Sequence, residues 1–237
     1  MLCKISDLLV EVPATGDMPE RCSEYLITDN KGNGADITIR ADLYKLDNWP
    51  DLDEVGGIYM ESGFSFYRNL LRFNGLMLHA SAVEYNGKAY LFSADCGTGK
   101  STHTQIWQQI YGDKAQVFND DKPALRKIDG RWYAYGTPWC GKDGINQNKK
   151  VPLGGICFLK RGTENKICNM SNKDAVINII RQSTRRLVSV ERMDLLLSLV
   201  DNLIREIPIF ELECLPNEEA AILSSTTMCR AAQEANL

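Results

Sequence analysis

The sequence predicts an α/β protein in which helices flank a mixed β-sheet and a small antiparallel β segment precedes the core. Apolar, β-type residues at 88–92 lead into a glycine-containing turn at 93–101, and a helical pattern follows at 102–111. Asn86-Gly87 precedes this strand and supplies the positive φ angles that a two-residue hairpin requires. The strand before the turn therefore has an antiparallel neighbour, whereas strand–helix–strand order elsewhere favours parallel pairs, so the sheet is mixed.

Length and composition are those of an ordinary globular protein. The 237 residues are 24% charged and 44% hydrophobic, and the net charge of −4 argues against a nucleic-acid partner. No apolar run reaches the roughly 18 residues of a membrane span. Lys4, Asp7 and Glu11 interrupt the apolar stretch that a signal peptide would need. We therefore expect a cytoplasmic protein that has no membrane partner.

The domain organisation is expected to be simple. Residues 1–237 are predicted to form a single domain, with a β-rich extension at 1–54 and the core at 55–237. The extension contains a turn cluster at 30–34 and three β-like segments, which we expect to form a small antiparallel sheet: 3–12, 24–28 and 35–44.

The core alternates between strand and helix patterns. Asp129-Gly130 marks a second hairpin, and 136–150 is a long polar loop. Strands are predicted at 76–85, 88–94, 115–118, 125–128, 132–135, 155–160 and 207–212. Helices are predicted at 55–73, 101–111, 174–187 and 191–205, and a last one starts near Asn217, whose side chain can cap it.

The cysteines do not suggest a zinc site. No C-x-x-C pair occurs, and the chain has only two histidines. We expect reduced and mostly buried thiols at positions 3, 22, 96, 140, 157, 168, 214 and 229. Cys96 lies beside a helix N-terminus, where a thiolate would be stabilised, but filling the loop is the favoured role.

The turn at 93–101 has the pattern of a phosphate-binding loop. Gly97 and Gly99 let successive N–H groups point inward at phosphate oxygens, and the helix that follows adds the positive end of its dipole. Lys100 can reach the β- and γ-phosphates, and the Ser101 hydroxyl can bind Mg²⁺. Ala94 stands where the usual motif has its first glycine, which indicates a separate lineage of the loop. The predicted nucleotide-binding residues are Cys96, Gly97, Thr98, Gly99, Lys100, Ser101 and Thr102.

Asp120 and Asp121 follow a β-like stretch about 20 residues after the loop. Adjacent carboxylates are costly unless a positive charge lies near them, and nucleotide-bound Mg²⁺ would supply one. One aspartate would hold the metal together with Ser101, while the other would accept the proton of a hydroxyl that is phosphorylated. The alternative is a surface turn with solvated charges.

Other polar residues have two interpretations each. His79 interrupts an apolar strand, so it is either a hydrogen-bonded core residue or a member of the site, because the hairpin ties its strand to the loop strand. His103 is predicted to have an exposed or packing role. The loop at 136–150 carries Trp139, Cys140 and Lys142 and could be a lid or substrate clamp, although a solvated Lys142 is favoured. A predicted helix carries three arginines on one face: Arg181, Arg185 and Arg186. These side chains either bind an acidic partner or are simply solvated.

The stretch from His79 to Asp121 resembles the HPr kinase/phosphorylase and phosphoenolpyruvate carboxykinase superfamily. The order of a histidine strand, a hairpin, the Gly97–Ser101 loop and paired aspartates is similar to the order in that superfamily. The resemblance implies its mixed-sheet P-loop kinase core. It also implies that Asp121 lies nearest the reacting centre, that Asp120 assists with the metal, and that His79 joins the catalytic group with Lys100. The chain looks most like the small HPr-kinase-related proteins that accompany peptide-modifying gene cassettes.

The hypothesis from the sequence is therefore an ATP-dependent phosphotransferase of the HPr kinase-like type. It would use Mg²⁺ and ATP, or another nucleoside triphosphate, to phosphorylate a hydroxyl of a protein or peptide, serine being the expected acceptor. Two alternatives remain: a small-molecule kinase on the same scaffold, and a nucleotide-binding regulatory module that transfers nothing. The sequence does not indicate an oligomeric state.

Overall fold

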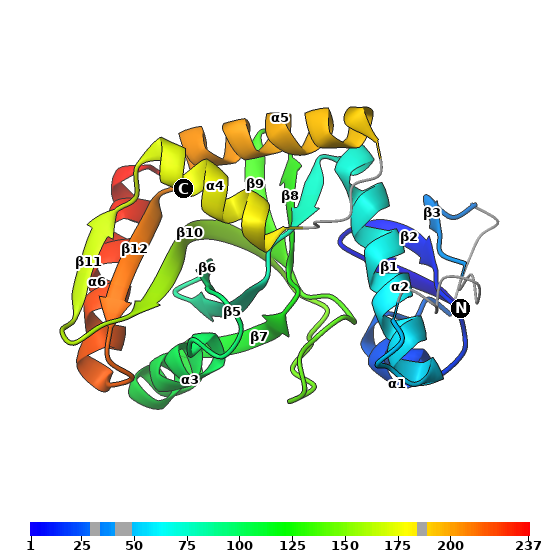
Figure 1. The fold of residues 1–237 in the computed structure, drawn as a ribbon, viewed down its shortest axis with the longest axis horizontal. Coiled ribbons are helices and arrows are strands. Elements are labelled where there is room, and N and C mark those ends of the chain that lie inside the picture. Colours follow the sequence, from blue (N-terminus) through cyan, green and yellow to red (C-terminus); the bar gives the residue numbers. More distant parts are fainter. Residues whose placement is uncertain (29–33, 41–48, 184–188) are drawn as a thin grey trace.

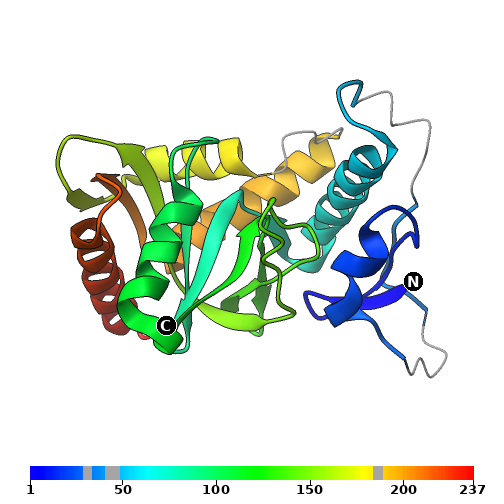
Figure 2. The same cartoon turned by 90° about the horizontal axis from the view of Figure 1, so that it is seen from below.

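The computed structural model describes residues 1–28, 34–40, 49–183 and 189–237. It is a mixed α/β structure with a large, curled mixed sheet, helices against both faces of that sheet, and a small N-terminal sheet (Figure 1). The small sheet lies at the end of the molecule opposite the last helix in both views of the ribbon (Figures 1 and 2). That residues 1–237 behave as a single domain stays a prediction. Among the described residues, no helix is long and apolar enough to cross a membrane.

The elements have the following bounds. The strands are β1 (Leu2–Ile5), β2 (Leu8–Glu11), β3 (Ile37–Thr38), β4 (Gly75–Met77), β5 (Ala80–Tyr85), β6 (Lys88–Ser93), β7 (Ala115–Asp121), β8 (Ala124–Ile128), β9 (Arg131–Tyr135), β10 (Lys150–Arg161), β11 (Lys166–Asn169) and β12 (Ile209–Cys214). The helices are α1 (Met18–Arg21), α2 (Glu54–Leu70), α3 (Lys100–Tyr111), α4 (Asn172–Gln182), α5 (Val190–Glu206) and α6 (Glu218–Glu234), with short 3₁₀ turns η1 (Ser23–Tyr25), η3 (Leu71–Phe73) and η4 (Gly112–Lys114).

The strand directions bring four strand ends to one edge of the large sheet. The strands follow the order β4-β8-β9-β10-β6-β5-β7, and β12 pairs with β10. β10 is parallel to β6 and to β12, whereas β5 is antiparallel to both β6 and β7. β6, β7, β10 and β12 therefore run in the same direction, and their carboxyl ends lie on the same side. In open α/β sheets this is the side where ligands bind.

The predicted hairpin at Asn86-Gly87 is confirmed. Asn86 has φ 51° and Gly87 has φ 73°, and β5 and β6 pair from Tyr85–Lys88 back to Ala80–Ser93. The single strand predicted at 76–85 is wrong, because it is divided into β4, which pairs with β8, and β5. The chain leaves the sheet between them, since the N–H of His79 donates to the carbonyl of Gln182 at 2.7 Å rather than to a neighbouring strand.

The N-terminal sheet differs from the expected antiparallel arrangement. The segment predicted as one strand at 3–12 is a hairpin that turns at Ser6 and Asp7, both with positive φ. The segment at 24–28 is largely the turn η1, with an isolated bridge from Leu26 to Cys3 and a hydrogen bond from the N–H of Ile27 to the carbonyl of Leu2. β3 then pairs with β2 in parallel, so the sheet is mixed. The predictions for 30–33 and 41–44 lie outside the described residues.

Several boundaries in the core also move. β7 continues through the aspartates to its end at Asp121, and the edge strand β11 was not predicted because its sequence has little apolar pattern. β10 begins at Lys150 and is longer than predicted. The described part of the helix predicted at 174–187 ends at Gln182, and 184–187 lie outside the described residues. The cap of the last helix is confirmed, since Asn217 accepts a hydrogen bond from the N–H of Ala220 at 3.0 Å.

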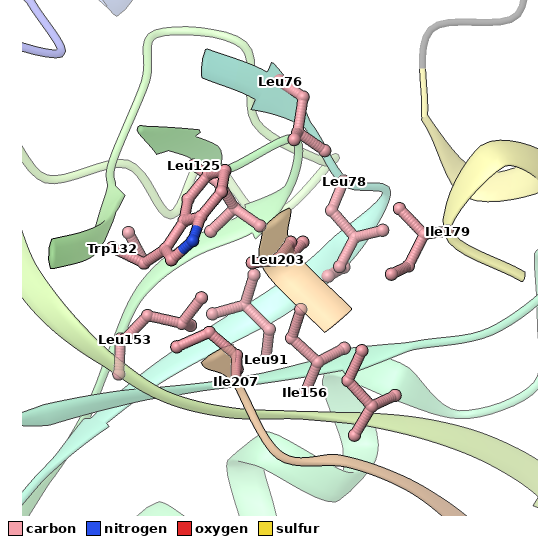
Figure 3. Packing of buried hydrophobic residues seen from close by; sticks show 14 of the residues in the cluster. Leu76, Leu78, Leu91, Leu125, Trp132, Leu153, Ile156, Ile179, Leu203 and Ile207 are labelled. Carbon is pink, nitrogen blue, oxygen red and sulfur yellow. The ribbon is translucent and has the colours of Figure 1, made fainter. Parts of the chain in front are cut away.

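The large sheet is buried on both faces by apolar residues that alternate along β6 and β10. Leu91, Ile156 and Phe158 face a core under α4 and α5, part of which is drawn in Figure 3. Tyr90, Phe92, Cys157 and Leu159 face a second core under α3 and α6. A third cluster joins the N-terminal sheet to α2 and Trp139. This double covering holds the strand ends rigidly, because close-packed cores resist displacement.

We predict that Gly136→Ala destabilises the fold. A Cβ at this position would lie 1.8 Å from the carbonyl oxygen of Gln147, a backbone atom that cannot swing away. Overpacking of this kind costs on the order of 1–3 kcal/mol. The measurement is the midpoint of thermal unfolding, with Gly34→Ala as the control, because nothing lies within 4 Å of a Cβ there. Equal midpoints for the two variants would show that the loop after β9 adapts.

Candidate active site

The pairing register brings the predicted site residues to one edge of the sheet. Ala80, the first residue of β5, pairs with Ser93 on one side and with Asp121 on the other. His79 therefore lies beside Asp121 and next to the turn that follows β6. These residues are far apart in the sequence but close in the fold. β5 pairs in antiparallel fashion with both β6 and β7, so the start of β5 lies beside the ends of the other two strands.

The turn after β6 combines two glycines of positive φ with the start of a helix, the two features predicted for it from the sequence. Gly97 and Gly99 have φ values of 75° and 115°, which only glycine adopts without strain, and α3 begins immediately afterwards at Lys100. Lys100 is buried and its ammonium donates to the carbonyl of Ala94 at 3.1 Å. Burial lowers the pKa of Lys100, and the neighbouring Asp121 carboxylate opposes this shift. Cys96 is exposed.

Ser101 and Asp120 form the candidate metal pair. The Ser101 hydroxyl lies 2.9 Å and 3.1 Å from the two carboxylate oxygens of Asp120. Hard oxygen donors of this kind suit Mg²⁺, which usually keeps several waters and binds through one or two protein groups plus phosphates. Within the described parts of the chain, no group of three or more His, Cys, Asp or Glu residues could hold a metal. The two oxygen donors Ser101 and Asp120 fit a metal whose other ligands are phosphates and waters.

Asp121 is held between two nitrogen donors. His79 Nε2 lies 3.0 Å from its Oδ1, and Lys122 Nζ lies 2.6 Å from its Oδ2. Burial raises the pKa of Asp121, but the hydrogen bond from His79 and the charge of Lys122 outweigh it and hold the pKa well below its usual range. The sequence predicts a positive charge beside the acid pair, with Mg²⁺ as the expected source, and Lys122 also supplies one next to Asp121.

Asp121 also has an unusual backbone. Its φ is 96°, a region that residues with a side chain rarely adopt. Strain of this kind persists where the surroundings over-determine a conformation, and it gathers at functional sites. Here the Gly141 N–H donates to the carbonyl of Asp120 at 2.7 Å, and Cys140 forms a bridge with Asp121. The loop after β9 thus fixes the backbone of both aspartates.

Three functional candidates were not found from the sequence. Lys122 contacts Asp121 and the Tyr59 hydroxyl, and its place directly after the acid pair was a usable signal. Gln182 hydrogen-bonds both His79 and Asp95, but it is 103 residues away from His79 and no local pattern marks it. Arg161, at the end of β10, donates to the carbonyl of Gly97.

Two pockets lie on the two sides of this cluster. One has a volume of about 410 Å³ and lies between the loop and the ends of β10 and β12, with Gly97, Thr98, Gly99, Thr102, Arg161 and Pro216 among its lining residues. The other has a volume of about 360 Å³ and is lined by Met60, Phe64, Met77, His79, Asp121, Lys122, Arg181, Gln182 and Ser183. His79 and Asp121 thus line the second of these pockets, whereas Gly97, Thr98, Gly99 and Thr102 of the loop at 93–101 line the first.

The loop at 136–150 packs along the end of β7. The N–H of Asp120 donates to the carbonyl of Ile145 at 3.1 Å, and the N–H of Gln147 donates to that of Phe118 at 2.8 Å. Trp139 is fully buried and stacks on Phe66 of α2 at 4.8 Å between ring centroids. Its side chain is therefore part of a core instead of a clamp over the site.

The other residues considered from the sequence lie in different environments. Lys142 is exposed, as predicted. Arg181 is exposed, as expected for a solvated helix face, and it also lines the second pocket and lies 3.8 Å from the Asp95 carboxylate. Arg185 and Arg186 lie outside the described residues. All eight cysteines are free, as expected, but only four of them are buried: Cys3, Cys22, Cys140 and Cys157.

His103 has a packing role, one of the two roles that the sequence predicted for it. It is buried under α6, where its Nε2 lies 2.9 Å from the Ser224 hydroxyl, and burial lowers its pKa to about 4. In an unfolded chain, histidine has a pKa of about 6.5. Between these values the unfolded state binds a proton that the folded state does not, so stability falls as the pH falls.

We therefore predict that His103→Gln flattens the pH dependence of stability. Between pH 7 and pH 5 the His103 contribution amounts to about 2 kcal/mol, which the wild type loses and the variant keeps. Urea unfolding at the two pH values measures this difference. A loss of the same size in both proteins would mean that His103 is charged in the folded state.

Comparisons with known proteins give a family and a distant structural likeness. The structure of the Hpr(Ser) kinase/phosphatase from Coxiella burnetii is similar to this chain with a TM-score of 0.39 and 10% sequence identity, over 68% of this chain and 92% of that one. A comparison with curated proteins gave no match. The family model for the SynChlorMet cassette protein ScmC matches residues 58–215, which is more than half of the chain and includes the loop, both aspartates and His79. The chain belongs to the ScmC family.

Proposed function

We propose that this protein is a nucleotide-dependent kinase that transfers the γ-phosphoryl group to a hydroxyl, expected to be that of a serine in a peptide. One observation carries the proposal: the strand register places Lys100, the Ser101–Asp120 pair and Asp121 together, with a separate pocket on each side of this cluster. Two substrates that exchange a group need two adjoining sites and a charged centre between them.

The first pocket suits the nucleotide. Its position at the carboxyl ends of β6, β10 and β12 and at the N-terminus of α3 is favourable for phosphates. Loop amides and Lys100 would hold the β- and γ-phosphates, and Arg161 would add a second positive charge at Gly97. Ser101 and Asp120 would hold Mg²⁺, which when bound supplies charge neutralisation for the phosphates. The pocket volume of about 410 Å³ leaves space for the nucleoside.

The transfer step assigns a role to each side chain. The acceptor oxygen forms a bond to the γ-phosphorus while the bond to the bridging oxygen breaks, and the nucleoside diphosphate leaves with that electron pair. Lys100 stabilises the charge that develops on the transferred group. Asp121 orients the hydroxyl and takes its proton. Because its pKa is held low, this transfer comes late, which suits the loose transition state of phosphoryl transfer.

The second pocket favours a peptide over a polyhydroxylated small molecule. Met60, Phe64 and Met77 give it an apolar wall next to Asp121. Sugar or polyol hydroxyls against this wall would lose their hydrogen bonds to water without replacement, which costs about 1–3 kcal/mol for each unpaired group. An apolar side chain beside the acceptor hydroxyl would instead gain from burial.

The test is a transfer assay with γ-labelled ATP and Mg²⁺. The acceptors are an array of serine peptides, including those encoded in the same cassette as the gene, and a panel of hydroxylated metabolites. We expect label on peptides only. Label on metabolites only would support the small-molecule alternative, and tight ATP binding without transfer to any acceptor would support the regulatory module. Lys142→Ala, which changes an exposed loop residue, is the control for preparation effects.

A further inference from the structure

A narrow apolar cleft beside α2 adjoins the second pocket. The cleft and the pocket share four lining residues, which are Met60, Phe64, Met77 and Lys122. The cleft is also lined by Gly63 and Tyr67 of α2 and by Trp139 of the loop after β9. Because Asp121 lines the second pocket, the cleft lies next to the carboxylate that would meet the acceptor hydroxyl.

The cleft residues that are not shared with the second pocket are held in place, and their polar atoms are already paired. The Nε1–H of Trp139 donates to the Ser62 hydroxyl at 3.0 Å. The Tyr67 hydroxyl donates to the carbonyl of Lys122 at 2.6 Å. α2 packs closely on the indole, since a Cβ at Gly63 would lie 2.9 Å from Trp139 Cδ1. A polar group that entered the cleft would therefore lose its hydrogen bonds to water without replacement, whereas an apolar group would gain from burial.

The cleft is small, and Met60 sets its width. Its volume is about 20 Å³, little more than one water molecule requires, so it has space for a single methyl group. Of the shared apolar residues, Phe64 stacks on Trp49 at 5.4 Å between ring centroids, and Met77 is held in β4. Met60 is partly buried on α2, and its unbranched side chain is the one that can adapt to a bound group.

Lys122 relates the cleft to the acceptor position. It follows Asp121 in the chain and lines both the cleft and the second pocket, and its ammonium lies 2.6 Å from Asp121 Oδ2. An extended peptide spans about 3.3–3.6 Å per residue. A peptide whose serine lies at Asp121 therefore brings a side chain one or two positions away to the opening of the cleft.

We propose that this cleft is a specificity pocket, which takes a small aliphatic side chain of the acceptor peptide within two residues of the phosphorylated serine, and that Met60 limits the size of this side chain. The inference deepens the proposed function and rests on it for the identity of the bound chain. The apolar lining selects against charged and polar side chains, and the volume selects against large ones. One methylene group more or less in an apolar pocket changes kcat/KM by about 10–200-fold.

The test is a series of serine peptides in which one of the two positions on either side of the serine carries glycine, alanine, valine, leucine, phenylalanine or aspartate. At one of these positions we expect kcat/KM of the wild type to be highest for alanine or valine. We expect it to be lower by about 10-fold or more for leucine, phenylalanine and aspartate. A wild type that phosphorylates the alanine and phenylalanine peptides equally well at every position would overturn the proposal without any variant.

Variants at position 60 change the width of the cleft. Met60→Ala widens it, and we expect the ratio of kcat/KM for the leucine peptide to that for the alanine peptide to rise by about 10-fold or more. Met60→Leu nearly conserves volume and is expected to keep the wild-type preference. The matched control is Met193→Ala, which makes the same change at an exposed methionine of α5 outside the cleft and the second pocket. The same ratio in Met60→Ala as in the wild type, or an equal shift in Met193→Ala, would refute the role of Met60.

Peptide binding separates this inference from the proposed function. Fluorescence anisotropy with labelled peptides of the same series gives dissociation constants without transfer, and we expect the affinities to follow the same order as kcat/KM. If the peptides bind in this order but none is phosphorylated, the proposed function fails while the specificity pocket stands. If all serine peptides are phosphorylated equally whatever their neighbouring residues, the proposed function stands and the specificity pocket is wrong. No binding of any peptide of the series would also overturn the specificity pocket.

Discussion

Replacing Asp121 with asparagine is expected to lower phosphoryl transfer by a factor of roughly 10²–10⁴, the usual contribution of a positioned proton acceptor. Asparagine has nearly the same size but cannot take the acceptor proton. It also leaves Lys122 and the His79 ring without the carboxylate that each contacts. Nucleotide binding is expected to change little, because Gly97, Thr98, Gly99 and Thr102 of the loop line the first pocket, whereas Asp121 lines the second.

The measurement is kcat for peptide phosphorylation together with the dissociation constant for ATP. Asp143→Asn is a matched control, because it makes the same change at an exposed position of the loop after β9. Equal kcat values for Asp121→Asn and the wild type would remove Asp121 from the mechanism. A large loss of ATP affinity in Asp121→Asn would instead place this carboxylate at the metal, in the role assigned to Asp120.

Replacing Lys100 with methionine is expected to weaken both ATP binding and transfer, with kcat reduced by about 10²–10³, the loss seen when one preorganised donor is removed. Methionine fills a similar volume but cannot donate to the phosphates. The ammonium is buried, and burial lowers its pKa, so the charge costs stability in the folded protein. We therefore expect the free energy of unfolding to stay the same or rise in this variant.

Opposite changes in activity and stability would separate a functional role from a structural one. Chemical denaturation gives the free energy of unfolding, and titration with a fluorescent ATP analogue gives the affinity. Lys142→Met is the control, since it removes an exposed lysine outside both pockets. Lower stability with unchanged ATP affinity would mean that Lys100 serves the fold, through its hydrogen bond to the carbonyl of Ala94.

The two adjacent aspartates of the site have different contacts. Asp120 meets a hydroxyl, whereas Asp121 meets Lys122 and the ring of His79. Two adjacent carboxylates in similar surroundings would repel each other, but these two face different partners and can have different roles. The contacts with His79 and Lys122 keep the Asp121 carboxylate ionised and oriented. They also lower its pKa, so this carboxylate is a weak base.

Residues in local patterns were predictable from the sequence. The loop at 93–101 and the Asn86-Gly87 hairpin each depend on a few neighbouring residues, and the acid pair was noticeable because it ends a β-like stretch. Lys122 directly follows the acid pair, so its place in the site was predictable on the same basis. Gln182 and Arg161 were not predictable, since neither belongs to a pattern and both reach the site only through the packing of α4 and the direction of β10.

The sequence by itself determined the mixed sheet, the hairpin before the loop and the candidate residues for binding phosphate and magnesium. These features follow from backbone preferences and side-chain chemistry over short stretches of chain. Only the tertiary structure decided that His79 leaves the sheet between β4 and β5, that it meets Asp121, and that Gln182 orients it. Those contacts join residues far apart in the chain, and they depend on strand register and helix packing, which local preferences do not encode.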